Sequence, residues 1–337
     1  MTKRVTLADL AEQTGRNIST ISRALSRPDR GSNETRRLVE KVASRLGYET
    51  NVAARNLSRG TSDTILVLAA SFSGQAISPV FTKVLLGVCE EAKVLGLNVM
   101  LRQYVGHSIA ISDVMRYLQA GVADSVLLVS SEQWQPPEDR EADQRMLPVV
   151  SIFKDLTASG LTSVMTQEAD GYVAIVDHMV ERGHRHFAFV SGPEGIGHEH
   201  IRYNAVKNRL STLGLGTKLI RLEGGPFDME SGARAARVFL ALKNRPTAAI
   251  CCSDAQALGF MHTVLENGLH VPHDVAIAGY DGMDYTAFTS PALTTVIQPM
   301  LEIGRVAVQV LTDIHNGRIT TPRLVALAPS FVVRQST

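Results

Sequence analysis

The stretch from Leu7 to Leu46 carries apolar positions at the spacing of three short helices. Gly15 and Gly47 follow the first and the third, where glycine readily adopts the left-handed backbone that ends a helix, and Ser32 is a good N-cap for the third. Two short helices this close together predict a helix-turn-helix, whose second helix can lie in the DNA major groove. The alternative is an ordinary pair of surface helices. The apolar faces comprise Leu7, Ala8, Leu10 and Ala11, then Ile18, Ile21 and Leu25, then Leu38, Val39, Val42 and Leu46.

Charge separates this N-terminal head from the rest of the chain. Residues 1–60 contain twelve Lys or Arg and six Asp or Glu, a net charge of +6. The remaining residues contain 22 Lys or Arg and 27 Asp or Glu, a net charge of −5. The overall balance of +1 therefore hides a basic head on a mildly acidic body. A basic cluster on its own helices indicates a polyanionic partner, and it favours nucleic acid over a membrane surface.

A short helical stretch over residues 51–57 follows the head and leads into a polar linker over residues 58–62. A helix of this length is not stable alone in water. A marginal helix between two domains is a candidate for folding on contact with DNA. We therefore expect a head over residues 1–48, a hinge helix and linker over 49–62, and a body over 63–337.

From Thr64 onward, short apolar runs alternate with amphipathic helices. Such alternation predicts an α/β body of doubly wound parallel sheets, and the number of strands divides naturally into two lobes with the chain crossing between them. Ligands of such folds bind outside the carboxyl ends of the strands, which here means between the lobes. The expected strands are 65–70, 98–101, 125–130, 149–153, 163–166, 186–191, 219–223, 248–253, 275–280 and 295–298, and the expected helices include about 80–95, 169–182, 201–213, 230–243 and 255–267.

Composition excludes several other classes of protein. A hydrophobic content of 45% suits buried sheets, yet no segment approaches the ~18 unbroken apolar residues of a membrane span. The N-terminal residues lack the pattern of a secretory signal, so we expect a cytoplasmic protein with no membrane partner. Cys89, Cys251 and Cys252 form neither a disulfide framework nor a metal-ligand spacing. We expect the adjacent pair to pack as small buried residues.

Several short segments of the head and the hinge carry a specific pattern: Thr20-Ile21-Ser22-Arg23, Glu34-Thr35-Arg36, Leu46-Gly47-Tyr48, Asn51 and Ala54-Arg55-Asn56-Leu57. These segments resemble the lactose-repressor (LacI/GalR) family of bacterial transcription regulators, and a looser similarity extends over nearly the whole chain. The resemblance implies a helix-turn-helix head, a hinge helix, and a two-lobed body like that of periplasmic binding proteins. It also implies that the hinge helices of two subunits pair in the DNA minor groove, where each inserts a leucine between base steps.

The resemblance implies a set of DNA-contacting residues in the head and the hinge. Leu57 matches the inserted leucine, the alternative being a linker leucine that covers the body. Arg23 can pair with guanine O6 and N7 or make a plain phosphate contact. Arg16-Asn17 and Thr50 depart from the family pattern; Asn17 can still cap the second helix, but Thr50 leaves the entry to the hinge less rigid. The full set is Thr6, Asn17, Ile18, Ser19, Thr20, Ser22, Arg23, Asn51, Ala54 and Leu57.

Ligand-binding candidates follow the expected strand ends. Arg202 opens a segment similar to the family helix whose arginine grips ligand hydroxyls or carboxylates, a task that suits its fixed fork of donors. Asp254 and Asp281 can accept hydrogen bonds from vicinal hydroxyls or cap the next helix, and for Asp254 capping is the favoured interpretation. Phe81 stacks on a sugar ring or packs in the lobe core. The remaining candidates are Ser71, Gln167 and Trp134.

Two of these candidates carry a further qualification. Gln167-Glu168 stands where many relatives have Asp-Asn. We therefore do not expect this protein to contact its ligand in the way that other family members contact simple hexoses. Trp134 lies in a long polar loop, and it either closes over a sugar or anchors the loop at the surface.

Other patterns do not amount to a catalytic or metal site. The glycines of residues 192–197 have the reverse of the dinucleotide-binding spacing, and Pro193 removes a backbone donor. His184 with His186, or His198 with His200, lacks helical metal-ligand spacing. We find no Ser-His-Asp order and no paired carboxylates that make a case for catalysis. We therefore expect no enzyme, no metal and no cofactor.

The favoured function is a ligand-responsive transcriptional regulator. We expect a homodimeric repressor of carbohydrate or sugar-acid utilisation genes. Its partners would be a near-palindromic double-stranded DNA operator and a small effector, a sugar or related metabolite, bound between the lobes. The alternative is a sugar-binding protein or an enzyme with an incidental helical N-terminus, but no base or nucleophile supports the enzyme.

Overall fold

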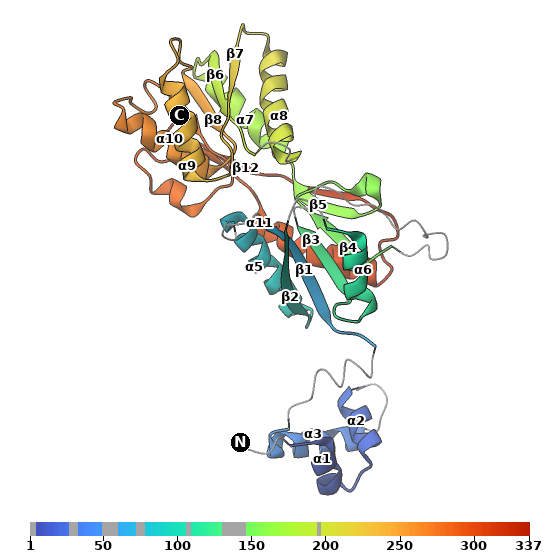
Figure 1. The fold of residues 1–337 in the computed structure, drawn as a ribbon. Helices are drawn as coiled ribbons and strands as arrows, with labels where there is room; N and C mark the ends of the chain where they lie inside the picture. Colours follow the sequence, from blue (N-terminus) through green and yellow to red (C-terminus); the bar gives the residue numbers. More distant parts are fainter. Residues whose placement is uncertain are drawn as a thin grey trace. The chain divides into compact units, whose positions relative to one another are not determined.

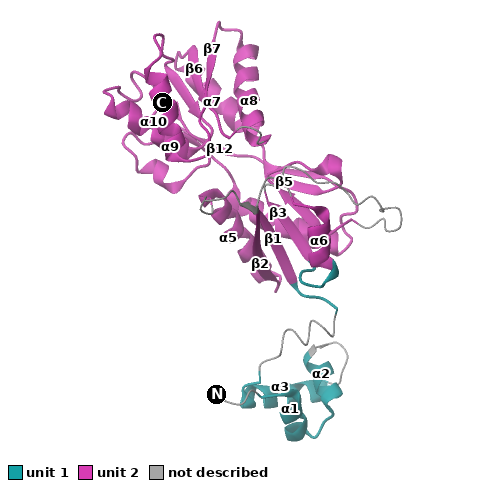
Figure 2. Cartoon of the chain, viewed as in Figure 1, with its two compact units in different colours: residues 1–63, 119–124 teal, residues 64–118, 125–337 magenta. Residues whose placement is uncertain are grey.

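The computed structural model describes residues 5–26, 33–48, 60–71, 78–105, 109–129, 146–193 and 197–337. The chain forms two compact units, Met1–Asp63 with Gln119–Asp124, and Thr64–Leu118 with Ser125–Thr337 (Figure 2). The hinge helix predicted over residues 51–57 lies outside the described residues. Among the helices that are described, none is long and apolar enough to cross a bilayer.

The head contains the three predicted helices, α1 (Leu7–Thr14), α2 (Ile18–Ser26) and α3 (Asn33–Leu46). Thr6 and Asp9 form a capping box at the start of α1, which satisfies backbone donors that a helix N-terminus leaves unpaired. Gly15 ends α1 in the left-handed conformation, with φ of 64°, as the sequence predicted. The three helices enclose one small core of Leu10, Ile21, Val39, Val42 and Ala43.

The first lobe is built on a six-stranded parallel sheet in the order β11-β5-β4-β3-β1-β2 (Figure 1). Helices α5 and α11 pack together over this sheet, and glycines allow their backbones to approach closely. A Cβ atom at Gly87 of α5 would lie 2.0 Å from the carbonyl oxygen of Leu301 of α11. The elements are β1 (Thr64–Ser71), β2 (Asn98–Val105), β3 (Ser125–Val129), β4 (Val149–Ile152), β5 (Thr162–Thr166), β11 (Leu324–Leu327), α5 (Pro79–Val94), α6 (Ile111–Gln119) and α11 (Met300–His315).

The second lobe is a four-stranded parallel sheet in the order β7-β6-β8-β9, with helices on both faces (Figure 1). Alternate residues of β6 face opposite cores: Phe187 and Phe189 pack with α7 and α8, whereas Ala188 and Val190 pack with α9 and α10. This is the doubly wound arrangement that the sequence predicted. The elements are β6 (His186–Val190), β7 (Lys218–Leu222), β8 (Ala248–Cys251), β9 (Ala276–Ala278), α7 (Glu168–Glu181), α8 (Gly197–Leu213), α9 (Met229–Leu240) and α10 (Asp254–Glu266).

The chain passes between the lobes more than once. It leaves the first sheet after β5 and returns after β10 (Thr295–Ile297) to form α11 and β11, and β12 (Ser330–Val332) then pairs antiparallel with β10. All ten predicted strands are present, with ends that differ by up to four residues. Helices α6 and α11, strand β11 and two short 3-10 helices, Thr157–Ser159 and Asp284–Ala287, were not predicted.

Candidate functional site

Helix α2 presents most of its predicted DNA-contacting residues to the surface. Ile18 is 50% exposed, and Ser19 and Arg23 are exposed as well, while Ile21 on the opposite side is fully buried. An apolar side chain at the start of a helix and half in water is available to contact base edges, for example a thymine methyl group. The described part of the head therefore has the geometry that a recognition helix requires.

Thr6 and Asn17 have local structural contacts. Thr6 Oγ1 accepts a hydrogen bond from the Asp9 amide at 3.4 Å and donates to Asp9 Oδ2 at 2.7 Å. The Asn17 carbonyl accepts bonds from the amides of Thr20 and Ile21, which begins α2. Thr20 and Ser22 are half-buried. The hinge candidates Asn51, Ala54 and Leu57 lie outside the described residues, so their roles stay predictions.

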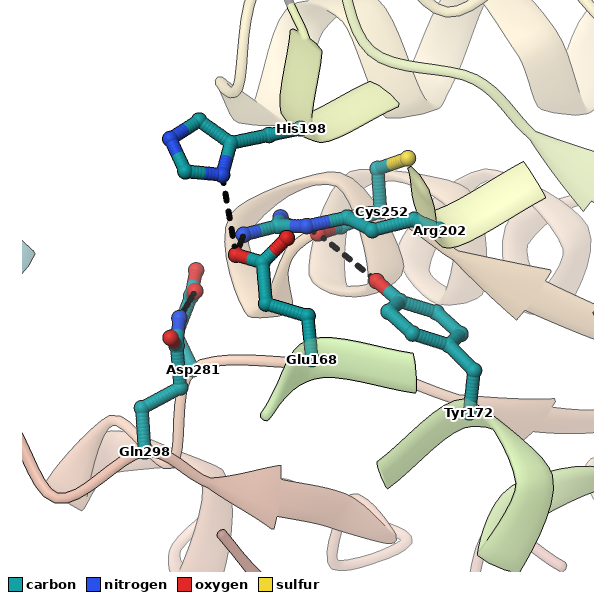
Figure 3. Close-up of polar contacts among 7 residues, drawn as sticks. All are labelled: Glu168, Tyr172, His198, Arg202, Cys252, Asp281 and Gln298. Carbon is teal, nitrogen blue, oxygen red and sulfur yellow. Dashed lines mark hydrogen bonds and ion pairs between the residues drawn. The ribbon is translucent and has the colours of Figure 1, made fainter. Parts of the chain in front are cut away.

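A second cluster of polar residues lies where parallel strands end, which is where ligands of doubly wound sheets bind. Each member follows a different strand. Glu168 comes after β5, Arg202 lies in the helix after β6, and Asp254 comes after β8. Asp281 follows β9 and Gln298 follows β10. Segments far apart in the sequence thus bring charged and amide side chains together, and Figure 3 shows this for Glu168, Arg202, Asp281 and Gln298.

Arg202 is the centre of this cluster. Its side chain is only 7% exposed; Nη2 donates to Glu168 Oε1 at 2.7 Å and Nη1 donates to the Cys252 carbonyl at 2.6 Å. The guanidinium carbon lies 4.7 Å from the centre of the Tyr280 ring, a cation–π contact. Tyr280 in turn stacks on Tyr172, with ring centres 4.6 Å apart. These contacts hold the guanidinium in one place.

Glu168 is ionised in spite of its burial. Burial alone would raise its pKa, but the charges of Arg202 and His198, together with their hydrogen bonds, lower the pKa from 4.5 to about 2. His198 Nδ1 lies 3.0 Å from the same oxygen that Arg202 contacts. The His198 ring also makes a T-shaped contact with the ring of Phe153 of the first lobe, with ring centres 6.2 Å apart.

Two aspartates complete the cluster. Burial raises the pKa of Asp254 to about 6 although Thr295 and the amides of Gly282 and Met283 donate to it. Burial also raises the pKa of Asp281 to about 8; Arg202 opposes this shift, and the charge of Asp254 adds to it. Gln298 Nε2 donates to Asp281 Oδ1 at 2.8 Å. Asp281 is therefore mostly protonated at neutral pH.

Several buried polar atoms of the cluster have no hydrogen-bond partner within the described structure. They include Glu168 Oε2, Arg202 Nε, Tyr280 Oη and Gln298 Oε1. Buried polar atoms are nearly always paired in folded proteins, and each exception calls for an explanation. Four such atoms around one ion pair mark a place where a polar ligand or ordered water would supply the missing hydrogen bonds.

The structure brings together only some of the predicted ligand residues. Arg202, Asp254 and Asp281 share the cluster. The favoured capping role of Asp254 is wrong, because the Ser253 side chain caps α10 by accepting from the Gln256 amide, which leaves the Asp254 carboxylate free to accept from Met283 and Thr295. Phe81 is 8% exposed and packs in the first-lobe core, the alternative that its pattern left open.

The other candidates lie outside the cluster or cannot be assigned to it. Gln167 is exposed, and its backbone N–H donates to the Leu327 carbonyl. Ser71 ends β1, but its side chain and all of Trp134 lie outside the described residues.

Sequence reasoning did not select Glu168, His198 or Gln298 as site residues. Glu168 was noted only as a departure from the family pattern, and that departure was the available signal. His198 was considered only as a metal ligand, and no group of His, Cys, Asp or Glu side chains in the described residues forms a metal site. Cys251 and Cys252 are fully buried, as predicted.

Comparisons with known proteins agree with this architecture. Residues 6–51 match the family model "Bacterial regulatory proteins, lacI family", and residues 176–337 match "Periplasmic binding protein-like domain". The chain is 31% identical to the transcriptional repressor CytR of Escherichia coli K12 over 93% of this chain and 90% of that protein. It is 28% identical to the repressor PurR of Photobacterium profundum over 98% of each chain.

Solved structures show the same fold. The lac repressor dimer bound to operator and an anti-inducer is 24% identical, with a TM-score of 0.82 over 99% of each chain. The regulator CelR in complex with cellobiose is 26% identical, with a TM-score of 0.70 over 99% of this chain and 100% of that one. A helix-turn-helix head joined to a two-lobed binding body defines a class of bacterial regulator. The chain belongs to the lacI family of bacterial regulatory proteins.

Proposed function

We propose that the protein is a transcriptional repressor that binds operator DNA as a homodimer and responds to a small polar effector, a sugar or related metabolite. The observation that carries the proposal is the presence in one chain of an exposed α2 face and a buried cluster of unpaired polar atoms. Its relatives CytR and PurR are named repressors, and the lac repressor structure holds a dimer on its operator. The protein would act in the cytoplasm, where its DNA lies.

We further propose that the effector acts through the hinge. The head would be residues 1–48 and the hinge and linker 49–62, with Leu57 inserted between base steps in the minor groove. The effector would change the separation of two hinge helices, so that heads without ordered hinges keep mainly phosphate contacts. Coupling of this kind typically amounts to about 1–3 kcal/mol. No catalytic step belongs to this mechanism.

Fluorescence anisotropy tests the function directly. The full-length protein is titrated into DNA from upstream of its own gene and neighbouring genes, with scrambled DNA as the control, and then again with a panel of sugars and nucleosides. We expect tight, salt-dependent binding to one fragment that one compound alters. The absence of any preference among the DNA fragments would reject the proposed function as a transcriptional regulator.

A substitution in the hinge tests the proposed role of the hinge helix in specific DNA binding. Leu57→Ala should weaken binding to the preferred fragment much more than binding to scrambled DNA, because only specific binding involves insertion of Leu57 between base steps. Equal losses on the two DNAs would reject the role of Leu57.

A further inference from the structure

The positive charge of Arg202 is already balanced inside the protein. The Arg202 and Glu168 side chains are 7% and 3% exposed, and their nearest nitrogen and oxygen atoms are 2.7 Å apart. A second guanidinium nitrogen is bound to the Cys252 carbonyl. A buried arginine with free donors is a strong site for carboxylate or phosphate. Here a side-chain carboxylate occupies the position that such an anion would take.

An anionic ligand would also meet negative charge. Glu168 keeps its charge at neutral pH, and its Oε2 is buried without a partner. Asp254 lies nearby, since its charge contributes to the raised pKa of Asp281. A second anion beside a buried carboxylate is unfavourable because little water is available to screen the repulsion. The cluster therefore disfavours a carboxylate or phosphate at Arg202.

The unpaired atoms indicate what the cluster accepts instead. Of the four unpaired atoms, Arg202 Nε can only donate a hydrogen bond, Glu168 Oε2 and Gln298 Oε1 can only accept one, and the Tyr280 hydroxyl can accept or donate. Acceptors that are buried and unpaired are satisfied by hydroxyl or N–H groups of a ligand. A hydrogen bond from a hydroxyl to an ionised carboxylate is stronger than one between neutral groups.

We propose that Glu168 is a specificity-determining residue: as an internal counterion of Arg202, it reserves this site for uncharged ligands that donate hydrogen bonds, such as neutral sugars or nucleosides. The inference rests on the proposed effector-binding function, and it narrows the class of effector. It makes Glu168 responsible for excluding sugar acids and phosphorylated sugars.

Glu168→Gln tests the counterion without knowledge of the ligand. Glutamine keeps the shape of the side chain but leaves the charge of Arg202 unbalanced. The full-length variant is unfolded thermally in rising concentrations of sodium phosphate, against sodium chloride at equal ionic strength. Phosphate stabilises folded proteins in general by its exclusion from their surface, so the wild type measures this background. We expect phosphate to raise the unfolding midpoint of Glu168→Gln by about 2–4 °C more than that of the wild type.

Glu199→Gln is the matched control. Glu199 is also a buried glutamate, 4% exposed, and its carboxylate lies 2.9 Å from Arg221 instead of Arg202. The unfolding midpoint of this control should respond to phosphate as that of the wild type does. A phosphate response of Glu168→Gln that equals those of the wild type and Glu199→Gln would overturn the proposal.

Matched ligand pairs test the wild type independently of any variant. Galactose is compared with galacturonate, ribose with ribose 5-phosphate, and adenosine with adenosine monophosphate, by the shift in unfolding midpoint. We expect stabilisation by the uncharged member of a pair and by no charged member. Stabilisation by a charged member equal to or above that of its neutral counterpart would overturn the proposal. DNA binding is measured separately, so a protein that prefers no DNA fragment would reject the regulator and leave this result standing.

Discussion

Arg202 and Glu168 should prove strongly coupled in stability. Both are buried, so removal of either leaves the other without its counterion. Burial alone would raise the pKa of Glu168, yet Arg202 and His198 lower it from 4.5 to about 2, which corresponds to about 3 kcal/mol of stability at neutral pH. We expect Arg202→Met to cost about 3–5 kcal/mol, the range for an unpaired buried charge. Combining it with Glu168→Gln should cost clearly less than the sum of the single changes.

The coupling also has a defined pH window. A carboxyl group with a lowered pKa stabilises the fold fully above its unfolded pKa, here 4.5, and loses that contribution as the pH falls toward about 2. Linkage therefore predicts that the stabilisation falls by about half between pH 7 and roughly pH 3.5. The difference between wild type and variants isolates this effect, because the other carboxyl groups are common to all four proteins.

Urea unfolding of the wild type, the two single variants and the double variant gives the coupling energy. Near-ultraviolet circular dichroism from the stacked pair Tyr172 and Tyr280 follows the second lobe, which contains this ion pair. Additive losses at pH 7 would refute the reasoning. A coupling energy that is the same at pH 7 and at roughly pH 3.5 would refute the assignment of the coupling to ionised Glu168.

Three further changes test the head and the site. Arg23→Ala, on the exposed face of α2, should weaken specific DNA binding at least about tenfold in anisotropy titrations; an equal loss on scrambled DNA would assign Arg23 to phosphate. Asp281→Asn should gain stability relative to wild type as the pH rises from about 4 through about 8, because the raised pKa makes ionisation of Asp281 destabilise the fold. Thermal unfolding at pH 4–9 measures this, and a flat difference would contradict it. His198→Ala should keep effector affinity within a few-fold but reduce the effector's influence on DNA affinity, normally about 5–150-fold, whereas exposed His200→Ala should not; a full response in His198→Ala would exclude it from the coupling.

Periodicity predicted the elements whose side chains pack in regular patterns. The head helices have one apolar face each, and the inner strands of the two parallel sheets, β3, β4, β6 and β8, are buried on two faces. Both kinds of element therefore stand out as apolar patterns. Helix α11 has the same kind of signal, with Ile303, Ala307, Leu311 and Ile314 at helical spacing, although this helix was not predicted. Strand β11 is different, because it is short and partly exposed at the edge of its sheet, where burial imposes no strong pattern.

The site was harder to predict because it depends on pairings between distant segments. A glutamate in the first turn of a helix ordinarily reads as a favourable charge near the helix dipole. Glu168 occupies such a position in α7, but the rest of α7, strand β6 and the start of α8 separate it from its partner Arg202 in the sequence. The backbone carbonyl of Cys252, which fixes the other end of the guanidinium, carries no sequence signal at all.

The contacts of His198 can connect effector binding to the arrangement of the two lobes. His198 of the second lobe lies between Glu168 and Phe153, and Phe153 follows β4 of the first lobe with a positive φ of 72°. A non-glycine residue in that region is strained and is usually held there by its surroundings. An effector that donates a hydrogen bond to Glu168 competes with His198 for the same carboxylate. Because His198 also contacts the first lobe, a change in its position alters a contact that joins the two lobes, without the need for a long chain of intermediates.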